Sequence, residues 1–153
     1  MRRPIAVLAV LALAAAALMG LTAIASSATS TPATVKTGTS SLGRIVVDGH
    51  AHTLYLFQKD KGGKSACSGA CAQNWPPLLT KGAPKAGPSA KASLLGTIKR
   101  GDGTTQVTYN KHPLYTFLGD AGKRGSTKGE GLTAFGAKWY VVAAKGTEKT
   151  GRY

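Results

Sequence analysis

The sequence predicts an all-β fold: a single small domain of two pseudo-repeated strand-hairpin units, with at most a short helix near the cysteine pair. Three observations lead to this prediction. From Leu42 onward, short runs rich in Val, Ile, Tyr and Phe alternate with Gly, Asp-Gly and Pro, which is typical of strands and turns. After residue 41 no apolar pattern keeps a helical period for three turns. A sequence motif also recurs after sixty residues.

The first 25 residues have the form of a signal peptide. Residues 1–3 include two arginines, residues 5–21 are apolar, and Ala23-Ile24-Ala25 has the small-x-small pattern of a signal-peptidase site. We therefore expect export by the general secretory route and cleavage after Ala25. The alternative is that the apolar run is kept as a membrane anchor. No Cys stands near this point, so we expect no lipid anchor.

The segment after the leader differs in composition from the rest of the chain. Residues 26–41 contain ten Ser or Thr in sixteen residues, which predicts a flexible tether between the envelope and the domain. The domain is expected to occupy residues 42–144, and residues 145–153 form a basic tail. A chain of this length leaves no room for a large multidomain enzyme, and no second long apolar stretch indicates a polytopic membrane protein.

Within the domain, β-branched and aromatic runs define the strands, and short turn dipeptides separate several of them. The expected strands are Arg44–Val47, Thr53–Phe57, Leu94–Ile98, Thr105–Tyr109, Leu114–Leu118 and Lys138–Ala143. The candidate hairpin turns are Asp48-Gly49, Asp102-Gly103 and Asn110-Lys111. Residues 68–75, around the cysteine pair, could form a short helix.

A second low-complexity stretch, residues 80–93, divides the domain into repeats at about 44–79 and 94–144. Each repeat contains the same five spaced residues and a later Trp. These residues are His52, Leu54, Tyr55, Phe57, Asp60 and Trp75 in the first repeat, and His112, Leu114, Tyr115, Phe117, Asp120 and Trp139 in the second. Neither half is large enough to bury a core of its own, so we expect the halves to pack into one domain across a flexible linker.

The alternation within the motif places its strand in the centre of the fold. Tyr55 and Phe57 point to one face of an extended strand, while Leu54 and Leu56 point to the other. Both faces are apolar, so the strand should lie between two layers. The motif Asp just past the strand is expected to bond the backbone amides of a turn. A calcium or substrate site made by the two carboxylates is the alternative.

These residues carry a resemblance to a known family. Tyr55 to Asp60 and Tyr115 to Asp120 look like the paired Y-x-[FWY]-x-x-D motif of the bacterial secreted-repeat family of unknown function, many of whose members are described as predicted lipoproteins. The segments around the cysteines, the two Trp residues and residues 106–110 are similar to the rest of its pattern. The resemblance covers about residues 42–144. It implies no specific activity.

Cys67 and Cys71 are the only cysteines. Export to an oxidising compartment favours a disulfide, which in so short a loop is worth about 2 kcal/mol in the loop-entropy model. The alternative is a thiolate pair that binds copper together with His52 or His112. For these histidines we expect a simpler position at the edge of a turn. We expect no resident metal and no cofactor.

The chain has 20 Lys and Arg against 6 Asp and Glu, and its formal charge of +14 becomes +12 when Arg2 and Arg3 leave with the leader. Such a charge favours solubility and attracts anionic polymers, including wall teichoic acids, acidic lipid head groups and DNA. No nucleic-acid-binding signature accompanies it, so no sequence-specific nucleic-acid recognition is expected.

The sequence therefore indicates an exported, monomeric envelope or extracellular protein that acts as a non-catalytic binding or structural module for anionic envelope components. No His-Glu-x-x-His, Gly-x-Ser-x-Gly or Ser-x-x-Lys motif is present, which argues against an enzyme. Two alternatives stay open. One is a copper or redox protein that uses the Cys pair, and the other is an envelope hydrolase that uses Asp60 and Asp120.

Overall fold

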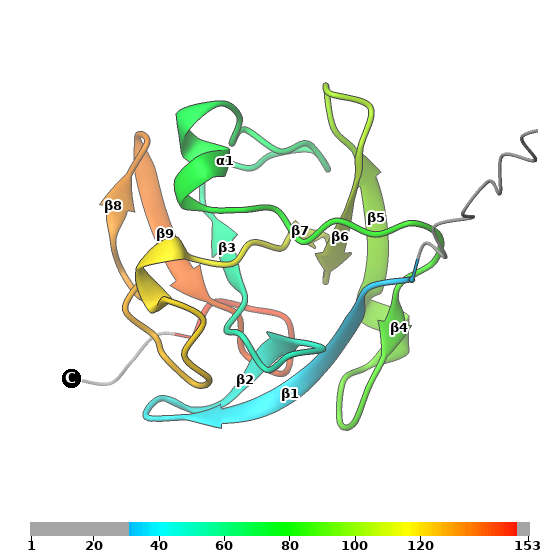
Figure 1. Cartoon of the computed structure of the whole chain (residues 1–153), viewed down its shortest axis with the longest axis vertical. Helices are drawn as coiled ribbons and strands as arrows, with labels where there is room; N and C mark the ends of the chain where they lie inside the picture. Colours follow the sequence, from blue (N-terminus) through cyan, green and yellow to red (C-terminus); the bar gives the residue numbers. More distant parts are fainter. Residues whose placement is uncertain (1–30, 150–153) are drawn as a thin grey trace, which may run out of the picture.

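The computed structural model describes residues 31–149, which form an all-β fold of short strands with little helix, as the sequence predicts (Figure 1). The signal peptide expected over residues 1–25 lies outside the described residues, as do residues 26–30 and 150–153. Across the described range, no helix is long and apolar enough to span a membrane.

The strands form three small sheets, ordered β2-β1-β4, β3-β9-β8 and β5-β6-β7. Neighbouring strands are antiparallel except β1 and β4, which run parallel. The strands are β1 Thr34–Ser40, β2 Gly43–Asp48, β3 Tyr55–Phe57, β4 Lys85–Ala86, β5 Leu95–Lys99, β6 Thr105–Tyr109, β7 His112–Pro113, β8 Thr133–Ala134 and β9 Ala137–Val141. The helical segments are α1 Ala70–Asn74 and the 3-10 turns η1 Ala92–Leu94 and η2 Leu118–Asp120.

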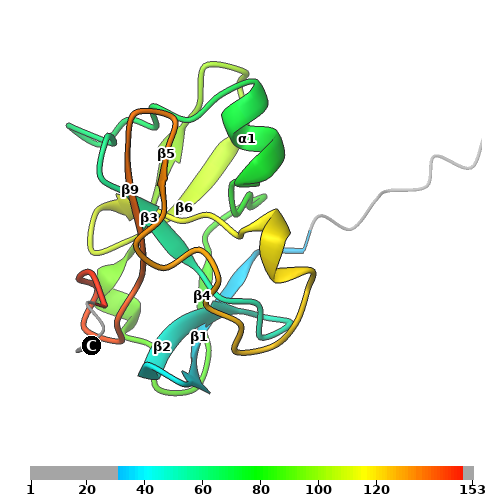
Figure 2. The same cartoon turned by 90° about the vertical axis from the view of Figure 1, so that its left-hand side faces the viewer.

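The sheets surround β3, which passes through the middle of the molecule between the β8–β9 hairpin and β5–β6 (Figure 1). The β1–β2 hairpin lies at the opposite end of the molecule from α1 (Figure 2). Two apolar clusters meet at β3. Tyr55 and Phe57 belong to one cluster and Leu54 and Leu56 to the other, and all four side chains are buried. The prediction of a central strand between two layers is therefore confirmed.

Most expected strands match observed strands, with shifted ends. The strand expected at Thr105–Tyr109 is β6 with the same bounds, and the expected short helix near the cysteines is α1. The turn at Asn110-Lys111 joins β6 to β7 with positive φ at both residues, 49° and 66°. Positive φ at both central positions is what a type I′ hairpin turn requires.

The strand expected at Leu114–Leu118 is wrong. Leu114 and Thr116 make isolated backbone hydrogen bonds, Tyr115 forms single β-bridges to Tyr55 and Pro77, and the chain then turns into η2. Leu118 is 65% exposed, so its apolar side chain does not continue the buried alternation. The turn needs glycine at residue 119, because a Cβ on Gly119 would lie only 2.4 Å from the Phe117 ring.

The flexible tether expected over residues 26–41 is also wrong for its second half, because β1 occupies Thr34–Ser40. This strand lies between β2 and β4, and Val35 is fully buried in the core. Thr is β-branched and favours extended backbone, so a Thr-rich segment can become a strand when it is given one buried anchor and a pairing partner.

The segment 80–93, expected to be a flexible linker, is likewise bound to the sheet. β4 pairs with β1, and the Gly87 amide donates to Val35 O at 2.7 Å. These bonds use main-chain atoms only, which explains why a segment without large apolar residues can form them. A Cβ on Gly87 would lie 2.9 Å from Lys36 Cβ, so glycine permits the close approach. The start of the expected basic tail is ordered too, since the Lys149 amide donates to Val141 O.

Candidate functional site

The two repeats exchange segments. In each half of the molecule, three backbone hydrogen bonds link three segments in a ring, and one of the three segments comes from the other repeat. The rings are Val46→Val142, Val142→Leu54 and Leu54→Val46 in one half, and Val107→Leu78, Leu78→Leu114 and Leu114→Val107 in the other, each at 2.8–3.1 Å from N to O. Each repeat therefore completes the other, and the expectation that neither buries a core alone agrees with this exchange.

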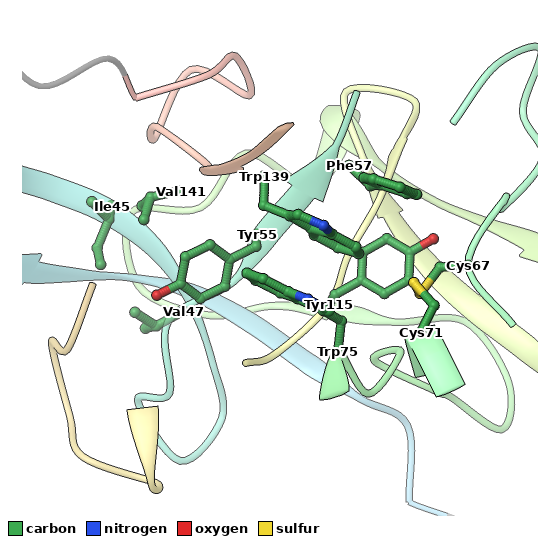
Figure 3. Packing of buried hydrophobic residues seen from close by; sticks show 10 residues of the cluster. All are labelled: Ile45, Val47, Tyr55, Phe57, Cys67, Cys71, Trp75, Tyr115, Trp139 and Val141. Atoms are coloured by element: carbon green, nitrogen blue, oxygen red, sulfur yellow. A yellow bond between two sulfur atoms is a disulfide. The ribbon is translucent and has the colours of Figure 1, made fainter. Parts of the chain in front are cut away.

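The side chains of the motif follow the same exchange and form a column of four stacked rings. Figure 3 draws three of them, Phe57, Trp139 and Trp75. Trp75 and Trp139 stack at its centre with ring centroids 4.0 Å apart. Phe57 stacks on Trp139 and Phe117 on Trp75, each at 4.1 Å, so each repeat's Phe covers the other repeat's Trp. Both Trp side chains are at most 1% exposed. The column is thus a structural core that joins the repeats, with Phe57 and both Trp rings buried and Phe117 partly buried at one end.

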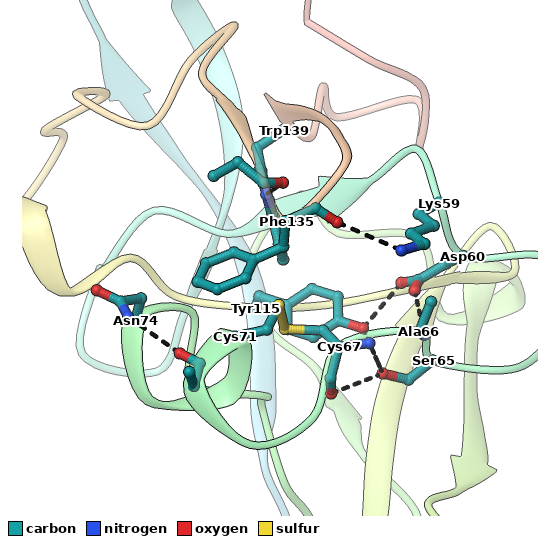
Figure 4. The surroundings of a disulfide bond; sticks show 12 residues. Lys59, Asp60, Ser65, Ala66, Cys67, Cys71, Asn74, Tyr115, Phe135 and Trp139 are labelled. Atoms are coloured by element: carbon teal, nitrogen blue, oxygen red, sulfur yellow. Dashed lines mark hydrogen bonds between the residues drawn. A yellow bond between two sulfur atoms is a disulfide. The ribbon is translucent and has the colours of Figure 1, made fainter.

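Each motif Tyr donates its hydroxyl hydrogen bond to the Asp of the opposite repeat. Tyr55 Oη lies 2.7 Å from Asp120 Oδ2, and Tyr115 Oη lies 2.8 Å from Asp60 Oδ2, the second of these bonds being drawn in Figure 4. The backbones of the two tyrosines also pair, through N–H···O bonds of 2.8 and 3.0 Å in both directions. The two motifs are therefore crossed and related by an approximate two-fold arrangement.

The remaining oxygens of both carboxylates bind the turns that follow. Asp60 Oδ1 accepts from the Ala66 amide at 2.7 Å. Asp120 Oδ1 accepts from the Ser126 hydroxyl at 2.6 Å and from the Lys128 amide at 3.1 Å. These bonds are the turn-binding role that the sequence indicates. They place each carboxylate in a separate network with the other repeat's Tyr, rather than together at one calcium or substrate site.

Asp60 should give the stability a pH dependence that replacement with Asn removes. Burial raises the pKa of Asp60 above its ordinary value of 3.8, against the lowering effects of the Ala66 amide, the Tyr115 hydroxyl and Arg100. The native state then holds this proton more tightly than the unfolded state, so stability falls as pH rises through the raised pKa. Relative to Asp60→Asn, the wild-type protein should lose stability as pH rises from about 4, measured by urea unfolding across a pH series.

Asp102→Asn is the control for this experiment. Bonds from the Thr104 hydroxyl and amide lower the pKa of Asp102. The contribution of the ionised Asp102 to stability is therefore present above the ordinary carboxyl pKa and is lost as pH falls. Stability then changes with pH in the opposite direction to that expected for Asp60. Parallel curves for the wild type and Asp60→Asn would contradict the assignment of the raised pKa to Asp60.

Cys67 and Cys71 form a disulfide, so within the described residues no free thiol is available to a metal. The copper alternative therefore has no support, because a disulfide cannot supply thiolate ligands. The bridge lies at the start of α1, beside Tyr115 and Trp139 (Figure 4). The bridge closes the short loop of residues 67–71 against the aromatic core.

The histidines occupy turn and strand edges. His52 accompanies Asp48 in the turn after β2, with His52 Nδ1 3.0 Å from Asp48 Oδ2. Asp48 Oδ1 accepts from the amides of His50 and His52, both at 2.9 Å. The possible ligand atoms of these three residues lie within 4.8 Å of one another, but both Asp48 oxygens already hold the turn together. His112 begins β7, and burial lowers its pKa.

Arg100 is the central polar residue that the sequence did not indicate. Its side chain is 6% exposed and ties the β5–β6 turn to the disulfide loop. Nη1 donates to Ser65 Oγ at 2.9 Å and to Gln106 Oε1 at 2.6 Å, and Nη2 donates to Cys67 O at 2.6 Å. The only sequence signal for this role was the Arg-Gly-Asp-Gly turn, which gives the position of the residue but not the direction of its side chain.

The charged groups are distributed unequally between interior and surface. Every Asp and Glu side chain of the chain lies in the described range and accepts an internal hydrogen bond. Their partners are His50 and His52 for Asp48, Ala66 and Tyr115 for Asp60, Thr104 for Asp102, Tyr55, Ser126 and Lys128 for Asp120, Val141 for Glu130 and Gln58 for Glu148. Between residues 31 and 149, ion pairs occur only at His52–Asp48 and Arg100–Asp102. No described Lys is therefore neutralised by a carboxylate.

Together these features define a two-repeat β module with an aromatic core, a disulfide-braced loop and an unpaired cationic surface. The family model described as a secreted repeat of unknown function matches residues 36–79 and 96–143, and the chain belongs to this family. The first match begins inside β1, in agreement with the structure rather than with the expected start at residue 42. No curated protein and no solved structure matches the chain. The family description agrees with export.

Proposed function

We propose that this protein is an exported, monomeric and non-catalytic module that binds anionic polymers of the cell envelope. The observation that carries the proposal is the division of charge: the acids are used in internal hydrogen bonds, while the lysines face solvent without carboxylate partners. An uncompensated cationic surface attracts polyanions and releases their counterions on binding. Export by the general secretory route would deliver it to a compartment rich in such polymers.

The use of the motif residues supports the non-catalytic part of the proposal. Catalysis by a carboxylate pair needs one group to act as acid and the other as base or nucleophile on a common substrate. Asp60 and Asp120 instead each accept a Tyr hydroxyl and a backbone amide. The residues that the two repeats share are thus engaged in joining the repeats.

Sedimentation with purified cell walls across a salt series tests this function. We expect retention at about 50 mM salt and release by about 500 mM, because counterion release makes binding of polyanions strongly salt-dependent. Walls stripped of their anionic polymers are the control and should retain little protein. Lack of retention on intact walls at every salt concentration would remove the proposal.

A further inference from the structure

A pocket of about 310 Å³ lies between the loop before α1 and the turn that joins β5 to β6. The first loop supplies Lys64, Ser65 and Ser68, the end of β5 supplies Lys99, and the turn supplies Arg100 and Asp102. Three cations therefore meet one carboxylate in one recess. Asp102 also accepts hydrogen bonds from the amide and hydroxyl of Thr104, at 2.9 and 2.6 Å.

The charge of Arg100 is only partly compensated within this recess. The guanidinium Nη atoms bind three uncharged acceptors, from Ser65, Gln106 and Cys67. Its Nε is buried and makes no hydrogen bond to any described residue, and the nearest carboxylate, that of Asp102, lies 3.7 Å away. A buried charge is costly unless an opposite charge and hydrogen bonds compensate it. An anion held in the pocket would supply further negative charge to this guanidinium.

The groups at the mouth are free to hold such an anion. Lys64 and Ser68 are exposed, and their side chains make no hydrogen bond within residues 31–149. Lys99 donates only to the Thr105 hydroxyl, at 2.7 Å. An ammonium on each side and a hydroxyl suit a tetrahedral anion, whose oxygens accept from several directions at once.

We propose that this pocket binds a single phosphodiester group of a flexible polyol-phosphate polymer, an inference that rests on the proposed function and assigns it a site. The volume is at the lower end of small-molecule sites, enough for one phosphate and its neighbouring polyol. A flexible polymer can place one phosphate in a recess, whereas a flat lipid surface presents its phosphates in a plane. The lysines act as point charges on the phosphate, and the buried Arg100 adds a third positive charge to the pocket.

A charge-matched pair of double variants tests the site in the full exported chain. The probe is a fluorescent glycerol-phosphate oligomer, and its affinity is measured by anisotropy. Lys64→Gln with Lys99→Gln should weaken binding about tenfold and reduce the salt slope by about 1, because the site neutralises one phosphate. Lys85→Gln with Lys145→Gln removes the same charge from exposed sites that do not line the pocket, and should change affinity less than about twofold.

A second pair of variants should change the affinity in the opposite direction. Asp102→Asn removes the one carboxylate that repels an anion from the pocket and keeps an oxygen for Thr104, so it should tighten binding about threefold. Glu148→Gln changes the net charge equally but lies outside this pocket, and should tighten binding less. These variants alter partly or fully exposed side chains, and circular dichroism checks that they remain folded.

The outcomes separate the site from the function. Equal losses in both lysine pairs would overturn the site and leave the proposed function as binding by diffuse charge. Tighter binding to phosphatidylglycerol vesicles or single-stranded DNA than to the oligomer would also overturn the polyol-phosphate assignment. If the wild-type chain binds no anionic probe, the proposed function itself falls.

Discussion

Replacing Trp139 with alanine should lower the free energy of unfolding by about 3–5 kcal/mol, the usual cost of removing a buried Trp. Trp139 is fully buried, stacks between Phe57 and Trp75, and meets the Tyr115 ring edge-on at 5.1 Å. Its indole N–H also donates to Ala134 O at 3.2 Å. Domains are typically stable by only 5–15 kcal/mol, so this one change removes a large part of the total.

Urea unfolding followed by far-ultraviolet circular dichroism measures the effect without relying on Trp fluorescence. Leu118→Ala is the control, because Leu118 is 65% exposed and its truncation should cost less than about 0.5 kcal/mol. Trp139→Phe should recover part of the loss, since a ring remains in the column. A Trp139→Ala loss as small as that of Leu118→Ala would show that the column does not hold the repeats together.

Much of the fold could be predicted because local chemistry decided it. The alternation of Leu54, Tyr55, Leu56 and Phe57 sets the two faces of β3 whatever its partners are, and the observed clusters follow it. The turn at residues 110–111 could be predicted because Asn tolerates positive φ and the dipeptide stands between two strand-like runs. These features depend on residues next to each other in the sequence.

The features that escaped prediction depend on distant partners. β1 is a strand because Val35 packs into a core built from residues far along the chain. The Ser/Thr-rich composition of the same segment, taken alone, predicts a tether. The repeat was visible in the sequence, but its exchange was not, because identical motifs do not show whether Tyr55 binds Asp60 or Asp120. The role of Arg100 likewise depends on a distant partner, because its guanidinium donates to Cys67 O in the disulfide loop.

Tyr55→Phe and Asp120→Asn each remove the crossed hydrogen bond between these two side chains. Each should lower the free energy of unfolding by about 2 kcal/mol, within the range for a hydrogen bond to a charged group. Both side chains are buried, and their oxygens lie 2.7 Å apart. Burial and the neighbouring Asp120 raise the pKa of Tyr55 above its ordinary value of 10, so the hydroxyl keeps its proton and remains the donor. Asp120 is therefore a buried acceptor that loses its partner when the hydroxyl is removed.

A double-mutant cycle over the two sites isolates the pair. We expect the combined variant to be more stable than the sum of the single losses predicts, by about 1–2 kcal/mol, because removing either partner already breaks the shared bond. Tyr140→Phe is the control, since that hydroxyl makes no hydrogen bond among the residues the structure describes and its removal should be nearly neutral. Strict additivity would show that the crossed bond contributes nothing.

The same variants separate a structural motif from a catalytic one. A buried carboxylate that serves hydrolysis usually lowers the stability of the fold. If Asp120 were such a residue, Asp120→Asn would abolish an activity and leave the melting temperature unchanged or raised. A carboxylate kept to join the repeats gives the reverse, so Asp120→Asn lowers the melting temperature because Tyr55 loses its hydrogen-bond acceptor. Because the two bonds cross between repeats, we expect Tyr55→Phe, Tyr115→Phe and Asp120→Asn to destabilise one common unfolding transition, monitored as a single cooperative step by circular dichroism.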